Sequence, residues 1–294
     1  MSWPETVVLG FGKMPFECAK ILLGRGIKVS FVCETEPEPF GQLRALCRRN
    51  NVPYFRPSNR ELTDLLGRVG GPAVVFSINN NYIFPPEIVQ KKNIRIVNFH
   101  NSVLPAYPGH GLIVPVWVIF NGEARHGVTW HLVDERLDAG RILCRDIFDV
   151  REDDTALTLM MRCVLRGIDL FAREFRSLLD FGCPGEPQAV HQPDVYKSPS
   201  RLQMRRKKDL PNGGFLDTAW SREACGRFLR SMDYGPYSLL PSPRIRLAGD
   251  VYVIRKYRAS EDRVPESGRR PDQWVLPFEP GAVALTIERE SSHG

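Results

Sequence analysis

The sequence contains no long hydrophobic run and no leader-like segment at its start. No stretch approaches the roughly 18 consecutive apolar residues that a membrane-spanning helix needs. The opening residues, MSWPETVVLGFG, lack a basic segment followed by a cleavable apolar run, so no signal peptide is predicted. We therefore expect a cytoplasmic protein. Its 294 residues, 43% of them apolar, are typical of one sizeable core plus a smaller unit.

Cysteine pairs at metal-binding or disulfide spacing are also missing. The seven cysteines are scattered along the chain, and none forms a C-x-x-C pair. An odd number at irregular spacing favours neither a disulfide framework nor a structural zinc site. We expect reduced thiols.

The glycine pattern of a dinucleotide-binding turn is incomplete. Gly10-x-Gly12 follows an apolar run, but Pro15 stands where the third glycine of G-x-G-x-x-G would be. No acidic residue clearly closes the next strand, although Glu34 and Glu36 lie nearby in a proline-rich loop. A nicotinamide cofactor is therefore not expected.

Positive charge is in excess but unevenly placed. The formal net charge is +6, yet residues 195–270 alone hold 17 lysines and arginines against 8 acidic residues. The densest run, Arg205–Lys208, is a candidate contact for phosphates of a nucleic acid, a nucleotide or a carrier-protein prosthetic group. The alternative is a solvated polar linker, which is the commoner role of such a run.

Apolar strand-like runs alternate with helix-like segments over the first 150 residues. This alternation predicts an α/β fold, with a Rossmann-like, mostly parallel sheet covered by helices, in which ligands bind beyond the carboxyl ends of the strands. The expected strands are 6–12, 27–33, 52–55, 73–78 and 94–100, and the expected helices are 15–26, 43–51, 60–71 and 85–92.

Two polar side chains close the last of these strands. Asn98 and His100 are two residues apart, so on a strand they point to the same face. The loop that follows is held by Pro105, Pro108 and Gly109. Asparagine and histidine at a strand end are often only hydrogen-bonded turn residues, so the pattern alone leaves a site and a satisfied turn equally open.

A second candidate segment runs from His126 to Leu143. Residues 127–133 alternate as a strand, and residues 141–148 form a plausible partner strand. The connecting loop, Asp134 to Gly140, carries three carboxylates. Its end, LDAG, places Asp138 beside a glycine that would allow close approach to a ligand.

Together these segments resemble the 10-formyltetrahydrofolate-dependent formyltransferases. The motifs stand in the family's order and close to its spacing, with a small insertion around residues 110–120. They are Asn98-x-His100, Ser102-Val103-Leu104-Pro105, Gly109, His126-Gly127-Val128-Thr129 and Leu137-Asp138-Ala139-Gly140. Their combination is far more specific than any single motif.

The resemblance implies that Asn98, His100 and Asp138 are catalytic. Attack of an amine on the formyl carbon creates an oxyanion and requires a proton to reach the leaving nitrogen. His100 would serve as hydrogen-bond donor or proton shuttle, and Asn98 would orient the formyl oxygen. Asp138 would fix the tautomer of His100 or hold a bridging water. Neither a metal nor a covalent nucleophile is expected.

The resemblance also implies contacts to the folate and to the substrate. Ile83 and Phe84 would flank the pterin, although both could be ordinary core residues, and backbone groups of residues 133–135 would bind its edge. The full set expected at the co-substrate is Tyr82, Ile83, Phe84, Ser102, Val133, Asp134 and Glu135. Leu104, Tyr107 and His110 are expected at the acceptor substrate.

The rest of the chain predicts a long helix and a second domain. Residues 153–182 read as an amphipathic helix capped by Asp153 or Asp154. Its apolar stripe would comprise Leu157, Met160, Val164, Ile168, Phe171, Phe175 and Leu179. We expect a catalytic domain at 1–182, a linker at 183–211 and a small β-rich domain at 212–294. Since the chain ends soon after Pro280–Gly281, that domain would be abbreviated or the chain cut.

The acceptor amine is left open among several classes. HGVTWHLVDE and DYGPYSLLP are most similar to formyltransferases associated with nonribosomal-peptide-type assembly, which favours a primary amine or hydroxylamine of an aminoacyl or natural-product intermediate, small or carrier-tethered. A nucleotide amino sugar is the first alternative. The basic C-terminal half also leaves methionyl-tRNA open. A non-catalytic folate-binding or carrier-docking module is disfavoured by the intact Asn98, His100 and Asp138.

Overall fold

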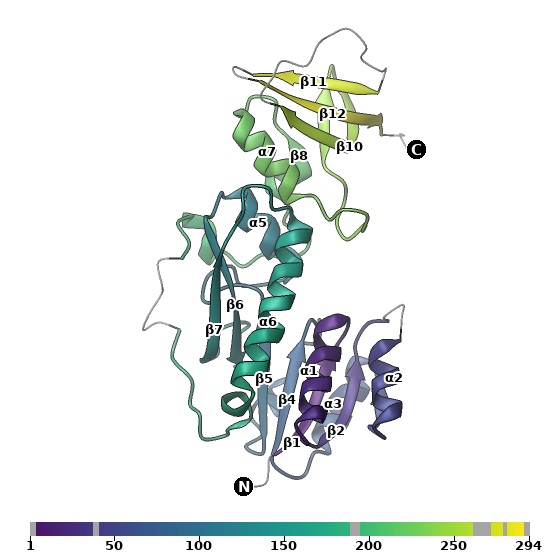
Figure 1. Cartoon of the computed structure of the whole chain (residues 1–294), viewed down its shortest axis with the longest axis vertical. Helices are drawn as coiled ribbons and strands as arrows, with labels where there is room; N and C mark the ends of the chain where they lie inside the picture. The colour runs from purple at the N-terminus through teal and green to yellow at the C-terminus, as the bar shows by residue number, and fades with distance from the viewer. Residues whose placement is uncertain (1–3, 38–40, 189–194, 261–271, 279–280, 291–294) are drawn as a thin grey trace. The chain divides into compact units, whose positions relative to one another are not determined.

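The computed structural model describes residues 4–37, 41–188, 195–260, 272–278 and 281–290 (Figure 1). The chain forms two compact units. The first comprises residues 1–111, 125–148 and 161–204, and the second comprises 112–124, 149–160 and 205–294. Parts of the expected linker and C-terminal domain, including Pro280, lie outside the described residues.

The first unit is built on a seven-stranded sheet, counted over the described residues, with strand order β3-β2-β1-β4-β5-β6-β7. Strands β1 to β5 run parallel, and β6 is antiparallel to β5. This confirms the predicted Rossmann-like fold class. The strands are β1 (Glu5–Gly10), β2 (Val29–Glu34), β3 (Tyr54–Phe55), β4 (Ala73–Ile78), β5 (Ile94–His100), β6 (Arg125–Leu132) and β7 (Ile142–Asp149).

Helices follow strands β1 to β4 as the alternation predicts, and the structure defines where each helix begins and ends. Helix α1 (Lys13–Gly24) begins two residues before Pro15, which sits in the first turn, where its missing N–H costs no helical bond. Helix α2 spans Gln42–Arg49. Helix α3 (Asn59–Gly67) begins with a capping box between Ser58 and Glu61, and α4 (Pro86–Val89) begins with proline.

Gly10 is required by packing rather than by a cofactor. A Cβ atom at this position would lie 1.7 Å from the carbonyl oxygen of Ile78 on the neighbouring strand, which no side chain can accommodate. The glycine turn that looked like part of a dinucleotide fingerprint therefore permits close approach of β1 and β4.

Helix α6 (Ala156–Leu179) begins later than predicted. Thr155, not Asp153 or Asp154, caps it: the Thr155 Oγ1 accepts from the Thr158 N–H at 3.3 Å. Its buried face is also rotated from the predicted stripe, because Leu157, Met160, Val164 and Ile168 are only half-buried. The buried residues are Ala156, Leu159, Cys163, Gly167, Leu170, Phe171, Phe175, Leu178 and Leu179.

Gly167 allows α6 to pack closely against the sheet. A Cβ there would lie 2.4 Å from the Phe99 ring and 2.6 Å from the Met14 side chain, so only glycine fits beneath β5. Next to it, Trp130 packs on Phe171 with ring centroids 5.3 Å apart. This face of the sheet thus anchors β5, the strand that carries Asn98 and His100.

The second unit joins helices to a smaller sheet. It contains α5 (Val114–Phe120), α7 (Arg222–Ser231) and a short 3-10 helix at Pro211–Gly214. A further 3-10 helix, Pro199–Leu202, belongs to the first unit. The second unit's five-stranded sheet, counted over the described residues, has the order β11-β12-β10-β9-β8. The strands are β8 (Phe215–Leu216), β9 (Arg244–Leu247), β10 (Asp250–Ser260), β11 (Gln273–Pro277) and β12 (Ala282–Arg289).

The two units differ from the predicted domains because of α5, which the sequence left unassigned within the insertion at 110–120. Its Phe120 ring packs 6.4 Å from that of Phe228 on α7, so the segment joins the second unit's core. The division therefore falls at Met204, inside the expected linker. The β9–β10 turn is formed by Ala248 and Gly249, both at positive φ.

Candidate active site

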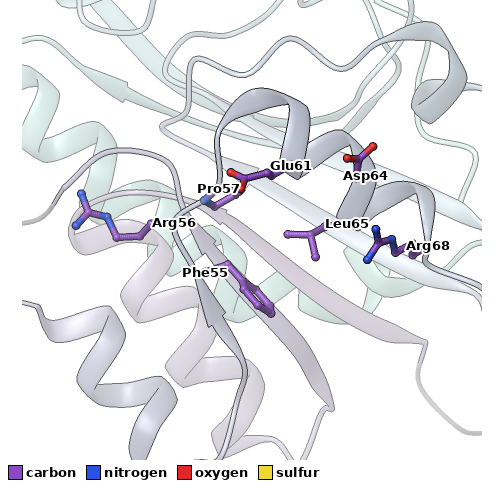
Figure 2. Close-up of a pocket in the computed structure, with 7 residues that line it drawn as sticks. All are labelled: Phe55, Arg56, Pro57, Glu61, Asp64, Leu65 and Arg68. Atoms are coloured by element: carbon purple, nitrogen blue, oxygen red, sulfur yellow. The ribbon is translucent and has the colours of Figure 1, made fainter.

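A surface pocket of about 300 Å³ lies at the β3 edge of the first unit's sheet (Figure 2). It is lined by Phe55, Arg56, Pro57, Glu61, Asp64, Leu65 and Arg68. None of these is a candidate site residue, and β2, β1 and β4 separate β3 from β5. The pocket therefore does not coincide with the site expected from the sequence.

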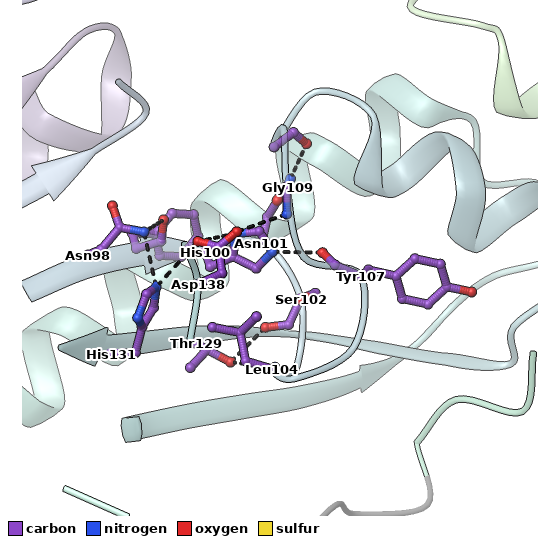
Figure 3. Close-up of polar contacts among 12 residues, drawn as sticks. Asn98, His100, Asn101, Ser102, Leu104, Tyr107, Gly109, Thr129, His131 and Asp138 are labelled. Carbon is purple, nitrogen blue, oxygen red and sulfur yellow. Dashed lines mark hydrogen bonds and ion pairs between the residues drawn. The ribbon is translucent and has the colours of Figure 1, made fainter. Parts of the chain in front are cut away.

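That site lies at the carboxyl end of β5, where the structure brings Asn98, His100 and Asp138 together (Figure 3). His100 is 4% exposed. Its Nε2 lies 2.8 Å from the backbone carbonyl oxygen of Tyr107. A carbonyl only accepts, so Nε2 carries the proton and Nδ1 is left as the nitrogen that faces Asp138, 3.8 Å from Oδ1.

Asp138 is held in place by backbone conformation and by its second oxygen. Its φ is +53°, a left-handed conformation that aspartate tolerates better than most residues. Its Oδ2 accepts from the Gly109 N–H at 2.8 Å, which ties the two loops of the site together. Gly140 is needed nearby, because a Cβ there would lie 1.8 Å from the Leu132 carbonyl oxygen.

The side-chain amide of Asn98, which was expected to orient the formyl oxygen, is already hydrogen-bonded within the protein. Its Oδ1 accepts from the Ser77 hydroxyl at 2.7 Å. Its Nδ2 lies 3.2 Å from the Phe99 carbonyl oxygen and 3.1 Å from His131 Nε2. The long bond to Phe99 is the one that a ligand oxygen would displace most easily.

His131 belongs to the site, although the sequence did not single it out. It is 2% exposed, and its Nδ1 donates to the Leu132 carbonyl oxygen at 2.8 Å, which leaves Nε2 as an acceptor. That Nε2 lies 3.8 Å from Asp138 Oδ1. Burial lowers the pKa of His131 to about 4, Asp138 opposes the shift, and His100 adds to it. His131 is therefore neutral at physiological pH.

The depressed pKa of His131 predicts a loss of stability in acid. The unfolded chain takes up this proton near its ordinary pKa of about 6.5, whereas the folded protein resists it down to about 4. The free energy of unfolding should therefore fall as the pH drops from about 6.5 to about 4, by up to about 3 kcal/mol from this group.

Urea unfolding at several pH values measures this effect, with His131→Gln as the test variant. The difference between wild type and variant should shrink as the pH falls through this window. His110→Gln, which changes a partly exposed imidazole, is the matched control. Parallel wild-type and His131→Gln curves across the window would contradict the assignment.

Three acceptor atoms lie near one another here: His100 Nδ1, His131 Nε2 and Asp138 Oδ1. The one lone pair of His131 Nε2 is already bonded to the Asn98 N–H, so His100 Nδ1 and Asp138 Oδ1 are the acceptors left for a ligand. With these tautomers none of the three can donate to another, and the gaps of 3.8 Å exceed direct hydrogen bonds. The arrangement is complementary to a group that carries several N–H or O–H donors. An amine is such a group.

The other residues expected at the substrate mostly shape the loop. Ser102 is fully buried and its hydroxyl donates to the Ala106 carbonyl oxygen at 2.5 Å. Leu104 and Tyr107 are also buried. The expected contacts of these side chains with the folate and the acceptor stay predictions. His110 is partly exposed and stays a candidate.

The residues expected at the folate divide into two groups. Tyr82 is a core residue whose hydroxyl lies 2.7 Å from Thr63 Oγ1, and Phe84 packs on it with ring centroids 5.0 Å apart. Ile83 is 69% exposed, so it is not a core residue and is available to a ligand.

In the 133–135 loop, the backbone N–H groups of Val133 and Glu135 are already bonded, to the Ile96 carbonyl oxygen and to Asp134 Oδ1. The Glu135 carboxylate accepts from the Gln90 amide at 2.9 Å. Asp134 and Glu135 are exposed. Contacts from this loop to a ligand would therefore come from the Asp134 N–H, carbonyl oxygens or side chains.

Over the described residues, no cluster of three or more His, Cys, Asp or Glu side chains has the geometry to hold a metal ion. No helix within the described part of the chain is long and apolar enough to cross a membrane.

Comparison with known proteins identifies the family and agrees with the fold. A family model described as formyl transferase matches residues 38–172. GDP-perosamine N-formyltransferase of Brucella melitensis biotype 1 is 30% identical over 257 residues, covering 85% of this chain and 93% of that protein. The chain belongs to the formyltransferase family, which confirms the predicted family and the predicted class of enzyme.

Two solved structures share the fold over nearly the whole chain. One is WlaRD, a sugar 3N-formyl transferase determined with dTDP and 5-N-formyl-THF, with a TM-score of 0.70, 15% identity and coverage of 98% of this chain and 99% of that one. The other is an N-formyltransferase from Helicobacter canadensis with folinic acid and dTDP-3-aminofucose, with a TM-score of 0.70, 16% identity and coverage of 96% and 99%.

Proposed function

We propose that this protein transfers a formyl group from 10-formyltetrahydrofolate to the amine of a nucleotide-linked amino sugar. The observation that carries the proposal is the 30% identity to GDP-perosamine N-formyltransferase over most of both chains. An aminoacyl or natural-product acceptor, which the sequence favoured first, has no comparable support. We therefore prefer the nucleotide amino sugar, which was the first alternative in the sequence analysis.

The convergent acceptors support this chemistry. An amino sugar is protonated near neutral pH, and a protonated amine carries several N–H donors that His100 Nδ1 and Asp138 Oδ1 can accept. When the acceptors of the site remove one of these protons, the lone pair of the amine nitrogen is free to attack the formyl carbon. The new bond joins the amine nitrogen to that carbon, and the bond that breaks joins the carbon to N10 of the folate.

His100 and Asn98 then have complementary roles. A protonated His100 presents an N–H at Nδ1, beside Asp138, and can stabilise the oxyanion or pass the proton to the leaving nitrogen. The Asn98 amide, once released from the Phe99 carbonyl oxygen, supplies a second donor to the oxyanion. Its other N–H keeps His131 in the neutral, accepting orientation.

A direct assay tests the proposal. The purified protein is mixed with 10-formyltetrahydrofolate and one amine at a time, and tetrahydrofolate release is followed by absorbance. We expect turnover with a GDP- or dTDP-linked amino sugar and a product heavier by one CO. Turnover only with methionyl-tRNA or with a carrier-tethered aminoacyl group would refute the choice of acceptor.

The response to salt separates a sugar nucleotide from tRNA. Arg205 stacks on the Trp117 ring, 3.5 Å from its centroid, so it is not displayed to a polyanion. A sugar nucleotide offers about two phosphates and lacks the condensed counterions of a nucleic acid, so its binding releases few ions. We expect a shallow slope of KM with salt and less than about a twofold effect of replacing Arg205–Lys208 by glutamine.

The same titration with initiator tRNA is the comparison. Tight tRNA binding that collapses between roughly 50 and 200 mM salt, and that is absent from the quadruple variant, would restore a role in translation.

A further inference from the structure

Residues 183–204 were expected to be part of a linker, but described parts of this segment contact both loops of the active site. The first unit includes these residues together with the site. One loop, residues 101–109, follows His100, and the other, residues 133–140, carries Asp138. We call them the histidine loop and the aspartate loop.

Tyr196 supports the histidine loop from within. It is 4% exposed, and its hydroxyl oxygen accepts from the Val103 N–H at 3.1 Å. The same hydroxyl lies 2.8 Å from His126 Nδ1 on β6. Its ring meets that of Tyr107 edge-on, with centroids 4.9 Å apart. The contacts link the loop to the sheet through one side chain.

Tyr107 is the residue whose carbonyl oxygen sets the tautomer of His100. Its φ is +52°, a left-handed conformation that is unfavourable for a large side chain, so the surroundings must hold it there. Its N–H donates to the Arg201 carbonyl oxygen at 2.5 Å, and its ring is held by Tyr196. The segment therefore holds the peptide group before the Tyr107 Cα and the Tyr107 ring, while the carbonyl oxygen after the Cα is bonded to His100.

Gln188 has the corresponding place at the aspartate loop. Its side-chain amide donates to the backbone carbonyl oxygens of Asp138 and Gly140, each at 2.7 Å. These bonds span the left-handed residue whose carboxylate faces both imidazoles. Without them, only the Gly109 N–H is seen to hold the Asp138 side chain among the described contacts.

We propose that Gln188 and Tyr196 are positioning residues for formyl transfer. Gln188 orients Asp138, and the Tyr196 hydroxyl, through the Val103 N–H and His126, holds the histidine loop whose Tyr107 carbonyl oxygen keeps the proton of His100 on Nε2. The proposal rests on the proposed function only in assigning the chemistry to His100 and Asp138. Neither residue touches the place where the acceptor groups converge, so their effect is on the orientation of the catalytic groups.

Tyr196→Phe and Gln188→Met test the two supports separately. Each removes hydrogen bonds while keeping most of the side-chain volume. We expect each to lower kcat by about 10- to 100-fold, because small misplacement of catalytic groups has effects of this size. KM for both substrates should change by less than about threefold, since neither residue is at a binding surface.

Tyr54→Phe is the matched control. It removes a hydroxyl that is bonded to Glu34 at the far, β3 side of the sheet, and kcat should stay at the wild-type value. Thermal unfolding of each variant, followed by circular dichroism, shows whether the folded population is intact at the assay temperature. A control that loses as much kcat as Tyr196→Phe would mean that general loosening explains both, and would overturn the proposal.

The tautomer of His100 gives a readout that does not depend on activity. In protein labelled with ¹⁵N-histidine at about pH 8, above the ordinary histidine pKa, the two ring nitrogens report which one is protonated. His100→Gln identifies the signals. We expect Nε2–H in wild type and a mixture of tautomers in Tyr196→Phe. Gln188→Met should leave the His100 tautomer unchanged while lowering kcat.

Failure of this inference is distinguishable from failure of the proposed function. Wild-type kcat in both variants, with an unchanged His100 tautomer in Tyr196→Phe, would overturn the positioning roles while formyl transfer stands. Absence of turnover with every amine would remove the proposed function, and the tautomer measurement would still decide whether Tyr196 sets the state of His100.

Discussion

His100→Ala is expected to abolish measurable formyl transfer. His100 presents Nδ1 to the place where the amine is expected, and its loss removes both the proton carrier and a donor to the oxyanion. General acid–base catalysis contributes about 10²–10⁴-fold, and a lost oxyanion donor about 10²–10³-fold. We therefore expect kcat to fall by at least about 10³-fold in the tetrahydrofolate-release assay.

Loss of the ring also affects the fold, so a second variant is needed. The Tyr107 carbonyl oxygen is buried with His100 and would lose its donor, at a cost of about 1–3 kcal/mol. His100→Gln keeps an amide N–H that can reach this oxygen but cannot carry a proton at neutral pH. Both variants should be inactive, with His100→Gln closer to wild type in thermal unfolding. Near-normal turnover by a folded His100→Gln protein would refute the catalytic assignment.

Asp138→Asn should have the second largest effect, a fall in kcat of about 10²-fold or more. Asparagine tolerates the left-handed backbone that Asp138 adopts, and its oxygen can still accept from the Gly109 N–H. The shape is thus retained. What changes is the charge opposite His100 and His131, which the carboxylate provides for the amine proton and for a protonated His100.

The kinetic pattern separates catalysis from binding. A fall in kcat and in kcat/KM by the same factor indicates an interaction realised in the transition state. Asp64→Asn, an exposed carboxylate beside the β3-edge pocket, is the matched control and should keep wild-type rates. An unchanged rate in Asp138→Asn would reduce Asp138 to a structural residue of the loop.

Much of the first unit could be predicted from local pattern. Buried parallel strands are continuous apolar runs, and glycine or proline marks their ends, so β1, β2, β4 and β5 were found close to their observed bounds. Helix α5 was missed because its sequence, VPVWVIF, is apolar on every side and carries no helical periodicity. Its place against α7, and with it the division into units, depends on packing between segments about 100 residues apart.

Local sequence patterns were enough to predict the family, the fold class and three site residues with distinctive spacing: Asn98, His100 and Asp138. These signals are local: a strand end, a loop rich in proline and a glycine next to an aspartate. Local spacing also placed Ser102, Leu104 and Tyr107 near the site, but it could not tell that their side chains are buried and serve the loop.

The protonation and hydrogen bonding of the groups at the candidate site could be read only from the folded structure. His131 enters the site because Asn98 and His131 are paired across β5 and β6, a register that no local pattern specifies. The tautomer of His100 depends on one backbone carbonyl oxygen, and that oxygen is held by residues far along the chain. Hydrogen-bond direction and burial depend on atoms that folding brings together. They therefore could not be predicted from the order of residues along the chain.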